Sequence, residues 1–180
     1  MNITELKVEL EKLHDSSFGW AMSCCRRNQP EAEEVLQTVY LKILQGKARY
    51  RGESALRTWL FAVIRKTAIS EHRKSLLRTL SPVAVPRPGK DRHPILELER
   101  SEMQRSFQEA LERLPARQRE TLHLVFYQDL SLSEAAQVME VSVGSARRHY
   151  ERGKKRLREL LDKEEIDYDV SWRTNSGAVL

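Results

Sequence analysis

Apolar residues recur every three or four positions through most of the chain, which is the spacing of amphipathic helices. Alternating strand-like runs are scarce, and only seven glycines interrupt the 180 residues. Leucine, glutamate, arginine and alanine, which all favour helix, are abundant. The pattern therefore predicts an all-α protein.

The N-terminal half predicts a series of helices. Residues 1–29 carry two apolar stripes with a break near residues 16–19, so we expect two short helices there. Pro30 stands where a helix tolerates proline, at its first turn, and glutamates follow it near the positive end of the helix dipole. This third helix is expected to end at about Leu44, and another is expected after Gly52.

Four of the six prolines lie between residues 80 and 94, which excludes helix and predicts an extended linker. We therefore divide the chain into a first domain (1–79), a linker (80–99), a second domain (100–162) and a frayed or disordered tail (163–180). At ~3.1 Å per residue the about fifteen residues of the Pro-rich stretch reach roughly 45 Å, more than one turn of duplex at about 34 Å. Two domains joined in this way can contact DNA at separated sites.

The second domain contains a helix-turn-helix pattern. Ser131 and Glu134 have the spacing of a capping box, so a helix should begin near Leu132. Its apolar stripe is interrupted after Met139, and Ser142 is a good N-cap for a second helix. A short helix, a tight turn and a second helix form the unit that enters the major groove of DNA.

Two packing expectations follow for this unit. The preceding helices, which meet at Pro115, should bury Ala135 and Val138 of the first helix. The second helix should bury one face, made of residues at helical spacing: Val143, Ala146 and Tyr150.

The opposite face of the second helix is strongly basic. Seven cationic side chains and one carboxylate lie between Gly144 and Arg158, a local charge of +6, within a chain of net charge +5 and pI near 9.3. A basic helical face is commonly only solvated surface. The capped helix and turn in front of this one supply the structural context of a DNA reader, and they favour DNA binding.

Aromatic and basic residues are also interleaved in the first domain. Tyr50, Trp59 and Phe61 precede a helix with five cations and one glutamate between Arg65 and Arg78. Single-stranded nucleic acid requires this combination, because bases stack on rings while phosphates attract cations. In the alternative interpretation, Trp59 belongs to the core, and Phe61 fits either location.

No enzyme chemistry is indicated. The two cysteines, Cys24 and Cys25, are adjacent, cannot complete a zinc site alone, and are expected to be structural rather than redox-active, with one buried and the other nearer solvent. No carboxylate or histidine set converges with metal spacing, so we expect no catalytic residue, metal or cofactor. With no membrane-span or signal-peptide pattern, the expected location is cytoplasmic.

Two blocks of the chain resemble a known family. RYRGESALRTWL with its following basic helix, and LPARQRETLHLVFYQDLSLSEAAQVMEVSVGSARR, are similar to the two blocks of bacterial sigma factors of the extracytoplasmic-function (ECF) group. The resemblance covers most of residues 5–78 and 100–161 and includes the order of the blocks and the Pro-rich linker. It implies an all-helical protein that binds core RNA polymerase and recognises the minus-ten and minus-thirty-five elements of promoter DNA.

The resemblance also implies roles for individual residues. The implied polymerase contacts are Glu31, Glu34, Val35, Gln37 and Tyr40. The implied pocket for a flipped minus-ten base comprises Tyr50, Phe61, Val63, Ile64 and Lys66. The implied minus-thirty-five contacts are Arg147, Arg148, Glu151 and Arg152 at base edges, with Ser145 and Lys155 on phosphates.

Three positions depart from the family pattern. Thr38 replaces an acid, Lys66 replaces the smaller polar residue of some relatives, and Glu140 replaces the usual glycine of the turn. If the turn requires a left-handed backbone, Glu140 costs on the order of 1 kcal/mol.

We therefore predict a sigma factor that acts by binding, with core polymerase and promoter DNA as partners. An anti-sigma protein, which commonly holds members of the family inactive, is a further implied partner. The alternative is a stand-alone helix-turn-helix regulator that binds promoters without polymerase. The first block separates the two, since a simple regulator has no use for a docking helix and an aromatic base pocket.

Overall fold

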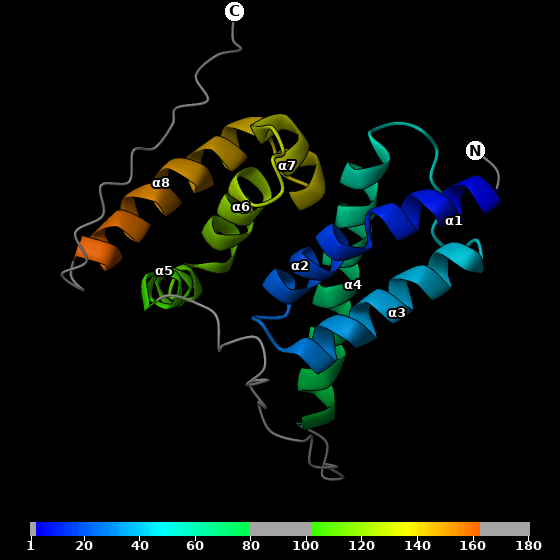
Figure 1. Ribbon diagram of the computed structural model, residues 1–180, viewed down its shortest axis with the longest axis horizontal. Helices are drawn as coiled ribbons and strands as arrows, with labels where there is room; N and C mark the ends of the chain where they lie inside the picture. The colour runs from blue at the N-terminus through cyan, green and yellow to red at the C-terminus, as the bar shows by residue number, and fades with distance from the viewer. Residues whose placement is uncertain (1–2, 80–101, 163–180) are drawn as a thin grey trace, which may run out of the picture.

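Eight helices and no strand form within the residues that the computed structural model describes, 3–79 and 102–162 (Figure 1). In chain order they are α1 (Ile3–Lys12), α2 (His14–Cys24), α3 (Gln29–Leu44), α4 (Leu56–Thr79), α5 (Glu102–Glu112), α6 (Ala116–Phe126), α7 (Leu132–Met139) and α8 (Val143–Asp162). The all-α prediction is confirmed in these ranges. The predicted linker (80–99) and tail (163–180) lie outside the described residues. None of the described helices combines the length and hydrophobicity that a bilayer span requires.

Helix α3 forms as its sequence predicts. Asn28 caps it by accepting a hydrogen bond from the Glu31 amide at 3.2 Å, Pro30 lies in the first turn, and Leu44 is the last residue. The predicted break near residues 16–19 is wrong, because the chain turns at Leu13 and α2 continues to Cys24. Tertiary packing outweighs the weak helix propensity of the serine and glycine residues, since one face of α2 is completely buried.

Helices α5, α6 and α8 enclose a small apolar cluster of their own. Its buried members are Ala110, Leu114, Leu122, Leu157 and Leu161. Helix α8 approaches α6 closely at Gly153, where an added Cβ would lie 3.1 Å from Leu122 Cδ1. The expectation that Val143 is buried is wrong, because it lies at the exposed start of α8 with 45% of its surface accessible. Ala146 is buried as predicted, and Tyr150 is half-buried.

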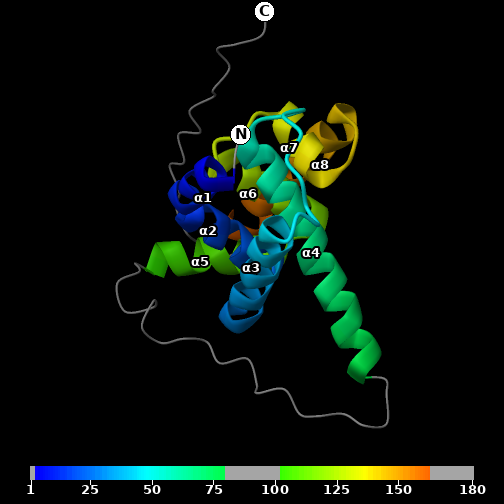
Figure 2. The ribbon, with the colours of Figure 1, turned by 90° about the vertical axis from the view of Figure 1, so that its right-hand side faces the viewer.

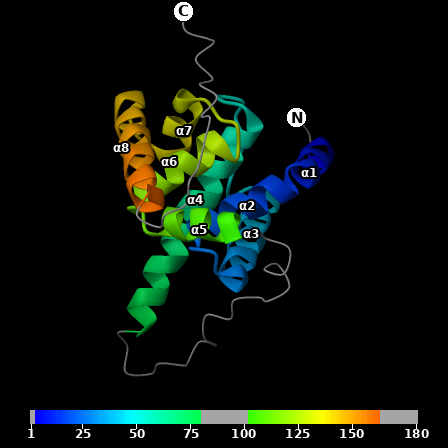
Figure 3. The same ribbon diagram turned by 60° about the vertical axis from the view of Figure 1, so that its left-hand side comes forward.

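The larger apolar cluster joins the two halves of the chain. It combines buried residues of α1 to α4 with Leu124 of α6, Leu130, and Ala135, Val138 and Met139 of α7. Helix α7 lies beside the N-terminal part of α4, and the C-terminal turns of α4 extend away from the body (Figures 1, 2 and 3).

The helices on either side of Pro115 are therefore not the main cover of α7. Helix α7 does contact α6, but its contact with α4 is more extensive, so the predicted packing of Ala135 and Val138 needs correction. An apolar stripe predicts that one face of a helix is buried, but it does not predict which helix covers that face.

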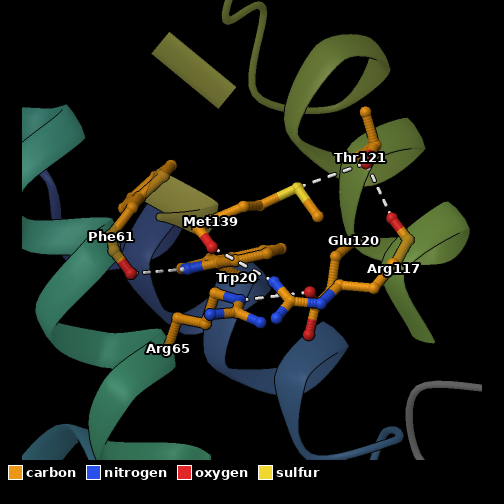
Figure 4. A network of polar contacts seen from close by, with 7 residues as sticks. All are labelled: Trp20, Phe61, Arg65, Arg117, Glu120, Thr121 and Met139. Atoms are coloured by element: carbon orange, nitrogen blue, oxygen red, sulfur yellow. Dashed lines mark hydrogen bonds and ion pairs between the residues drawn. The ribbon is translucent and has the colours of Figure 1, made fainter. Parts of the chain in front are cut away.

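Polar contacts also cross the boundary between the halves (Figure 4). The side chains of Arg65 on α4 and Glu120 on α6 form an ion pair with Nε 3.1 Å from Oε2, and they are only 7% and 10% exposed. Nearby, the Trp20 indole Nε1 donates to the Phe61 carbonyl at 3.0 Å. Both charges of the ion pair are thus largely removed from water and matched by each other.

The cysteines are both half-buried and do not form a disulfide. Burial raises the pKa of the Cys24 thiol well above its usual value, and burial together with Glu31 and Glu34 raises the pKa of Cys25 to about 12. Because the thiolate is the reactive form, both environments favour the structural role predicted from the sequence over redox chemistry.

His123 of α6 lies at the same boundary. Its ring centroid is 5.4 Å from that of Trp20 on α2 and 5.2 Å from that of Tyr127. Burial, with smaller contributions from Arg27 and Arg119, lowers the pKa of His123 from 6.5 to about 4. The imidazole is therefore neutral at physiological pH and packs as an aromatic ring.

We predict that acid destabilises the fold through His123. Because its pKa is lower in the folded than in the unfolded protein, the unfolded state binds more protons, so the free energy of unfolding falls as pH drops from about 6.5 towards 4. The full loss is on the order of 3 kcal/mol. Urea unfolding at a series of pH values should show this loss in the wild type and a smaller one in His123→Phe; parallel curves would contradict the assignment.

Candidate nucleic-acid interface

Local hydrogen bonds define the helix-turn-helix. The Ser131 hydroxyl accepts from the Glu134 amide at 3.2 Å, and the Glu134 carboxylate accepts from the Ser131 amide at 2.9 Å, so the predicted capping box is confirmed. The Ser131 hydroxyl also donates to the Glu134 carboxylate at 2.7 Å, and this bond, followed by the bond from the Ser131 amide, lowers the pKa of Glu134. Helix α7 therefore begins where the sequence places it.

The turn itself has a left-handed residue. Glu140 ends α7 with φ 53° and ψ 49°, the conformation that glycine adopts most easily. The Val141 amide donates to the Ala136 carbonyl at 3.0 Å, and Arg117 Nη1 of α6 donates to the Met139 carbonyl at 3.1 Å. These bonds satisfy carbonyl groups at the end of α7, and the α6 contact holds the turn at a fixed position.

Helix α8 starts at the next cap and presents its cations to solvent. The Ser142 hydroxyl accepts from the Ser145 amide at 3.1 Å. Five of the six predicted minus-thirty-five residues are exposed on α8: Arg147, Arg148, Glu151, Arg152 and Lys155. The sixth, Ser145, is half-buried, and its hydroxyl accepts from Arg148 at 3.3 Å. Glu151 is within 3.2 Å of Lys154, so the only carboxylate of this face is partly neutralised.

The charges of these arginines contribute to the pKa of a neighbouring histidine. Partial burial comes first in lowering the pKa of His149, followed by the charges of Arg117, Arg148 and Arg152. A cationic surface of this kind at the exposed start of a helix favours the phosphate backbone of a duplex.

A cavity lies in the first half, in the loop before α4. Its volume is about 420 Å³, and its lining comprises Gly46, Lys47, Arg49, Tyr50, Arg51, Glu53, Ser54 and Trp59. The Tyr50 and Trp59 rings are 5.4 Å apart, and the Tyr50 hydroxyl donates to the Ser54 carbonyl at 2.6 Å. Two aromatic rings beside three cations provide stacking surface and positive charge in one place.

The five predicted minus-ten residues do not share one exposed surface. Tyr50 lines the cavity, Val63 is half-buried and Lys66 is exposed, whereas Phe61 and Ile64 are fully buried in the shared core. Phe61 lies under α7 and stacks with Trp20, with the two ring centroids 6.1 Å apart. The sequence was compatible with Phe61 either on the DNA-facing surface or in the core, and in the structure it lies in the core.

The predicted polymerase-docking residues of α3 are also divided. Glu34 and Gln37 are exposed, and Glu31 and Tyr40 are half-buried, with Tyr40 contacting His14 at 3.2 Å. Val35 is 2% exposed and belongs to the core.

Sequence reasoning missed two neighbours on that helix face. Leu41 and Leu44 follow Glu34 and Gln37 at helical spacing and are 54% and 48% exposed. Apolar side chains on an otherwise solvated helix face are the available signal, but their distance from the core is visible only in the folded chain.

A capped helix-turn-helix with a cationic second helix, tied to a helical unit with an aromatic and basic cavity, defines a DNA-binding transcription protein with two contact regions. The family models that match are Sigma-70 region 2 over residues 10–76 and Sigma-70 region 4 over residues 104–157. The first match contains the cavity and α3, and the second contains the helix-turn-helix.

Similar proteins agree with these matches. The chain is 28% identical over 166 residues to ECF RNA polymerase sigma factor SigX of Bacillus subtilis (strain 168), covering 85% of this chain and 84% of the relative. It is 30% identical over 144 residues to ECF RNA polymerase sigma factor EcfG of Rhodopseudomonas palustris (strain TIE-1), covering 74% and 73%. A solved structure of the sigma factor RpoE in complex with the anti-sigma factor NepR from Bartonella quintana has a similar fold, with a TM-score of 0.71 and 24% identity over 92% of this chain and 100% of that one.

The chain belongs to the ECF sigma factors of RNA polymerase. It is thus an RNA polymerase-binding factor that directs transcription initiation at promoters. A stand-alone regulator is not favoured, because the first half matches sigma region 2.

Proposed function

We propose that the exposed face of α8 reads the minus-thirty-five element of the promoter. Its support is the capped start of α8 together with the outward position of Arg147, Arg148 and Arg152. Arginine donates two hydrogen bonds to guanine in the major groove, and such a pair contributes roughly 1 to 3 kcal/mol of discrimination against the wrong base. In this proposal Ser145 and Lys155 contact phosphates, and such contacts fix the register of the helix on the duplex.

The second DNA contact of the proposal is the cavity beside Tyr50. A base that leaves the stack needs an aromatic surface, and the cavity offers the Tyr50 and Trp59 rings among cations. Lys66 and Val63 extend this surface along α4. Phe61 and Ile64 join it only when α7 separates from α4, because both are covered in the described arrangement.

Core polymerase binds the exposed face of α3 in this proposal. Glu34 and Gln37 provide polar contacts, and Leu41 and Leu44 provide apolar area beside them. Glu31 and Tyr40 flank this face. Val35 supports it from the core.

The remaining partners and the location follow from these roles. An anti-sigma protein is proposed as a regulator, supported by the similar fold of RpoE solved with NepR. The protein acts by binding, with no catalytic step of its own, and works in the cytoplasm beside polymerase. Run-off transcription with purified core polymerase tests the proposed function as a sigma factor. Promoter-dependent transcripts should appear only when this chain is added. Their absence on every promoter offered would refute the proposal.

Removing the α8 arginines should abolish upstream recognition. The triple change Arg147→Ala, Arg148→Ala and Arg152→Ala should weaken protection of the minus-thirty-five region by at least about 100-fold in affinity, because base and phosphate contacts are lost together. DNase footprinting on a promoter that the wild-type holoenzyme transcribes measures this. Arg158→Ala, an exposed arginine at the other end of α8, is the matched control, and polymerase binding should be unchanged in all variants.

Removing the Tyr50 ring should slow strand opening. Tyr50→Ala deletes the stacking surface, worth about 1 to 3 kcal/mol per base, so permanganate reactivity at the minus-ten region should fall roughly ten-fold or more. Tyr50→Phe keeps the ring and loses only the hydroxyl bond to Ser54, so it should open promoters nearly normally. Equal defects in both variants would mean that the hydroxyl bond, and not stacking, matters.

Reversing a charge on α3 should weaken polymerase docking. Glu34→Lys places a cation on the proposed docking face and should reduce co-purification with core polymerase about ten-fold or more, as like charges across an interface cost several kcal/mol. Glu109→Lys makes the same change on the exposed face of α5 and serves as control. Full retention of polymerase by Glu34→Lys would remove α3 from the docking surface.

A further inference from the structure

Arg119 of α6 is a buried cation with weak hydrogen bonds. The residue is 8% exposed, and its Nη1 donates to the carbonyl groups of Glu112 and Leu114 at 3.5 and 3.4 Å, which is near the outer limit of a hydrogen bond. Its Nε is buried without a partner among the residues that the structure describes. Because a guanidinium group carries five N–H donors and a buried charge needs a counterion, the Arg119 side chain lacks part of its complement.

Two exposed arginines lie beside this buried one. Arg26 and Arg27 belong to the turn between α2 and α3, and this turn points toward α5 in Figure 1. Arg27 Nε is 3.7 Å from Oε1 of Glu112, and Arg119 donates to the backbone carbonyl of the same glutamate. Glu112 therefore joins the exposed arginine turn of the first half to the buried arginine of the second half.

The carboxylates near these arginines do not neutralise them. Glu120 interacts with Arg119, but it already pairs with Arg65 at 3.1 Å. Glu112 is thus shared among three arginines, and the local charge is +2. Burial first, and then the charge of Arg26, lower the pKa of the Arg119 guanidinium. Its surroundings therefore leave room for a further negative charge.

We propose that the cationic cluster formed by Arg26, Arg27 and Arg119 binds the phosphate group of a small anion. The excess charge of +2 matches a phosphate dianion, and guanidinium groups donate paired hydrogen bonds to phosphate oxygens. The two exposed arginines capture the anion from solvent, and Arg119 turns from its long carbonyl bonds to donate to it.

The bound anion would connect the two halves of the chain. Arg26 and Arg27 belong to the part that matches sigma region 2, and Arg119 belongs to the part that matches region 4. The cluster includes none of the residues proposed to contact the promoter or polymerase. The proposal therefore does not depend on the function proposed for those residues.

Nuclear magnetic resonance reads the binding at the Arg119 side chain itself. Inorganic phosphate, titrated into the full chain at constant ionic strength, should shift the Nε–H resonance of Arg119 together with the amide resonances of residues 25–28. Loss of this resonance in Arg119→Lys assigns it. Shifts confined to the cationic face of α8, with the Arg119 resonance unmoved, would mean that phosphate meets only general basic surface, and they would overturn the site.

A variant on the exposed turn keeps the test independent of the buried Arg119. Arg26→Ala should fold like the wild type, because its side chain is exposed, and should weaken phosphate binding about ten-fold in isothermal titration calorimetry, since one charged donor is lost. Lys7→Ala removes the same charge from the exposed side of α1 and should stay within about two-fold of the wild type, because salt screens a distant charge. Equal affinities of the two variants would contradict the proposal.

Glycerol phosphate distinguishes a phosphate ester from the free anion. An affinity similar to that of inorganic phosphate would identify the phosphate group of a larger metabolite as the ligand, and a preference for inorganic phosphate of about ten-fold or more would identify the free ion. Either ligand that binds should raise the thermal unfolding midpoint above that in sodium chloride of equal ionic strength. No rise with either one would refute the site. These measurements contain neither DNA nor polymerase, so a failure in run-off transcription leaves them unaffected.

Discussion

The buried ion pair between Arg65 and Glu120 is the interaction on which the arrangement of the two halves depends. Two charges with so little exposure are tolerated only while they neutralise each other, and breaking such a pair typically costs about 3 to 5 kcal/mol. The pair links α6 to α4 at the boundary where α7 covers Phe61 and His123 lies beside Trp20. One largely buried polar contact thus accompanies the apolar contacts that join the halves.

The helix-turn-helix obeys a different constraint. Its helices begin at local caps, and its turn is held by backbone bonds and by Arg117 of α6, all within the second half of the chain. The inner face of α8 packs on α6 at Gly153, and this leaves the arginine face in solvent. The chain therefore exposes the cationic face of α8 and the cavity beside Tyr50, whereas the candidate minus-ten residues Phe61 and Ile64 are covered.

This asymmetry suits a sigma factor, whose two regions act at separate promoter elements on the polymerase. The exposed cavity beside Tyr50 and the covered ring of Phe61 lie in the same region 2 half, yet they differ in accessibility. A base can reach the first without any rearrangement. The second is covered by α7.

The sequence by itself determined the family to which the chain belongs and the features that arise within a few residues: the capping box at Ser131, the first turn of α3 around Pro30 and the cationic face of α8. These are set by local hydrogen bonds and helical spacing. Only the tertiary structure decided that α4 covers α7, that Arg65 meets Glu120, and that Phe61 and Val35 lie in the core. Each of these joins residues far apart in the chain, and an apolar stripe or a lone charge in a sequence does not specify its partner.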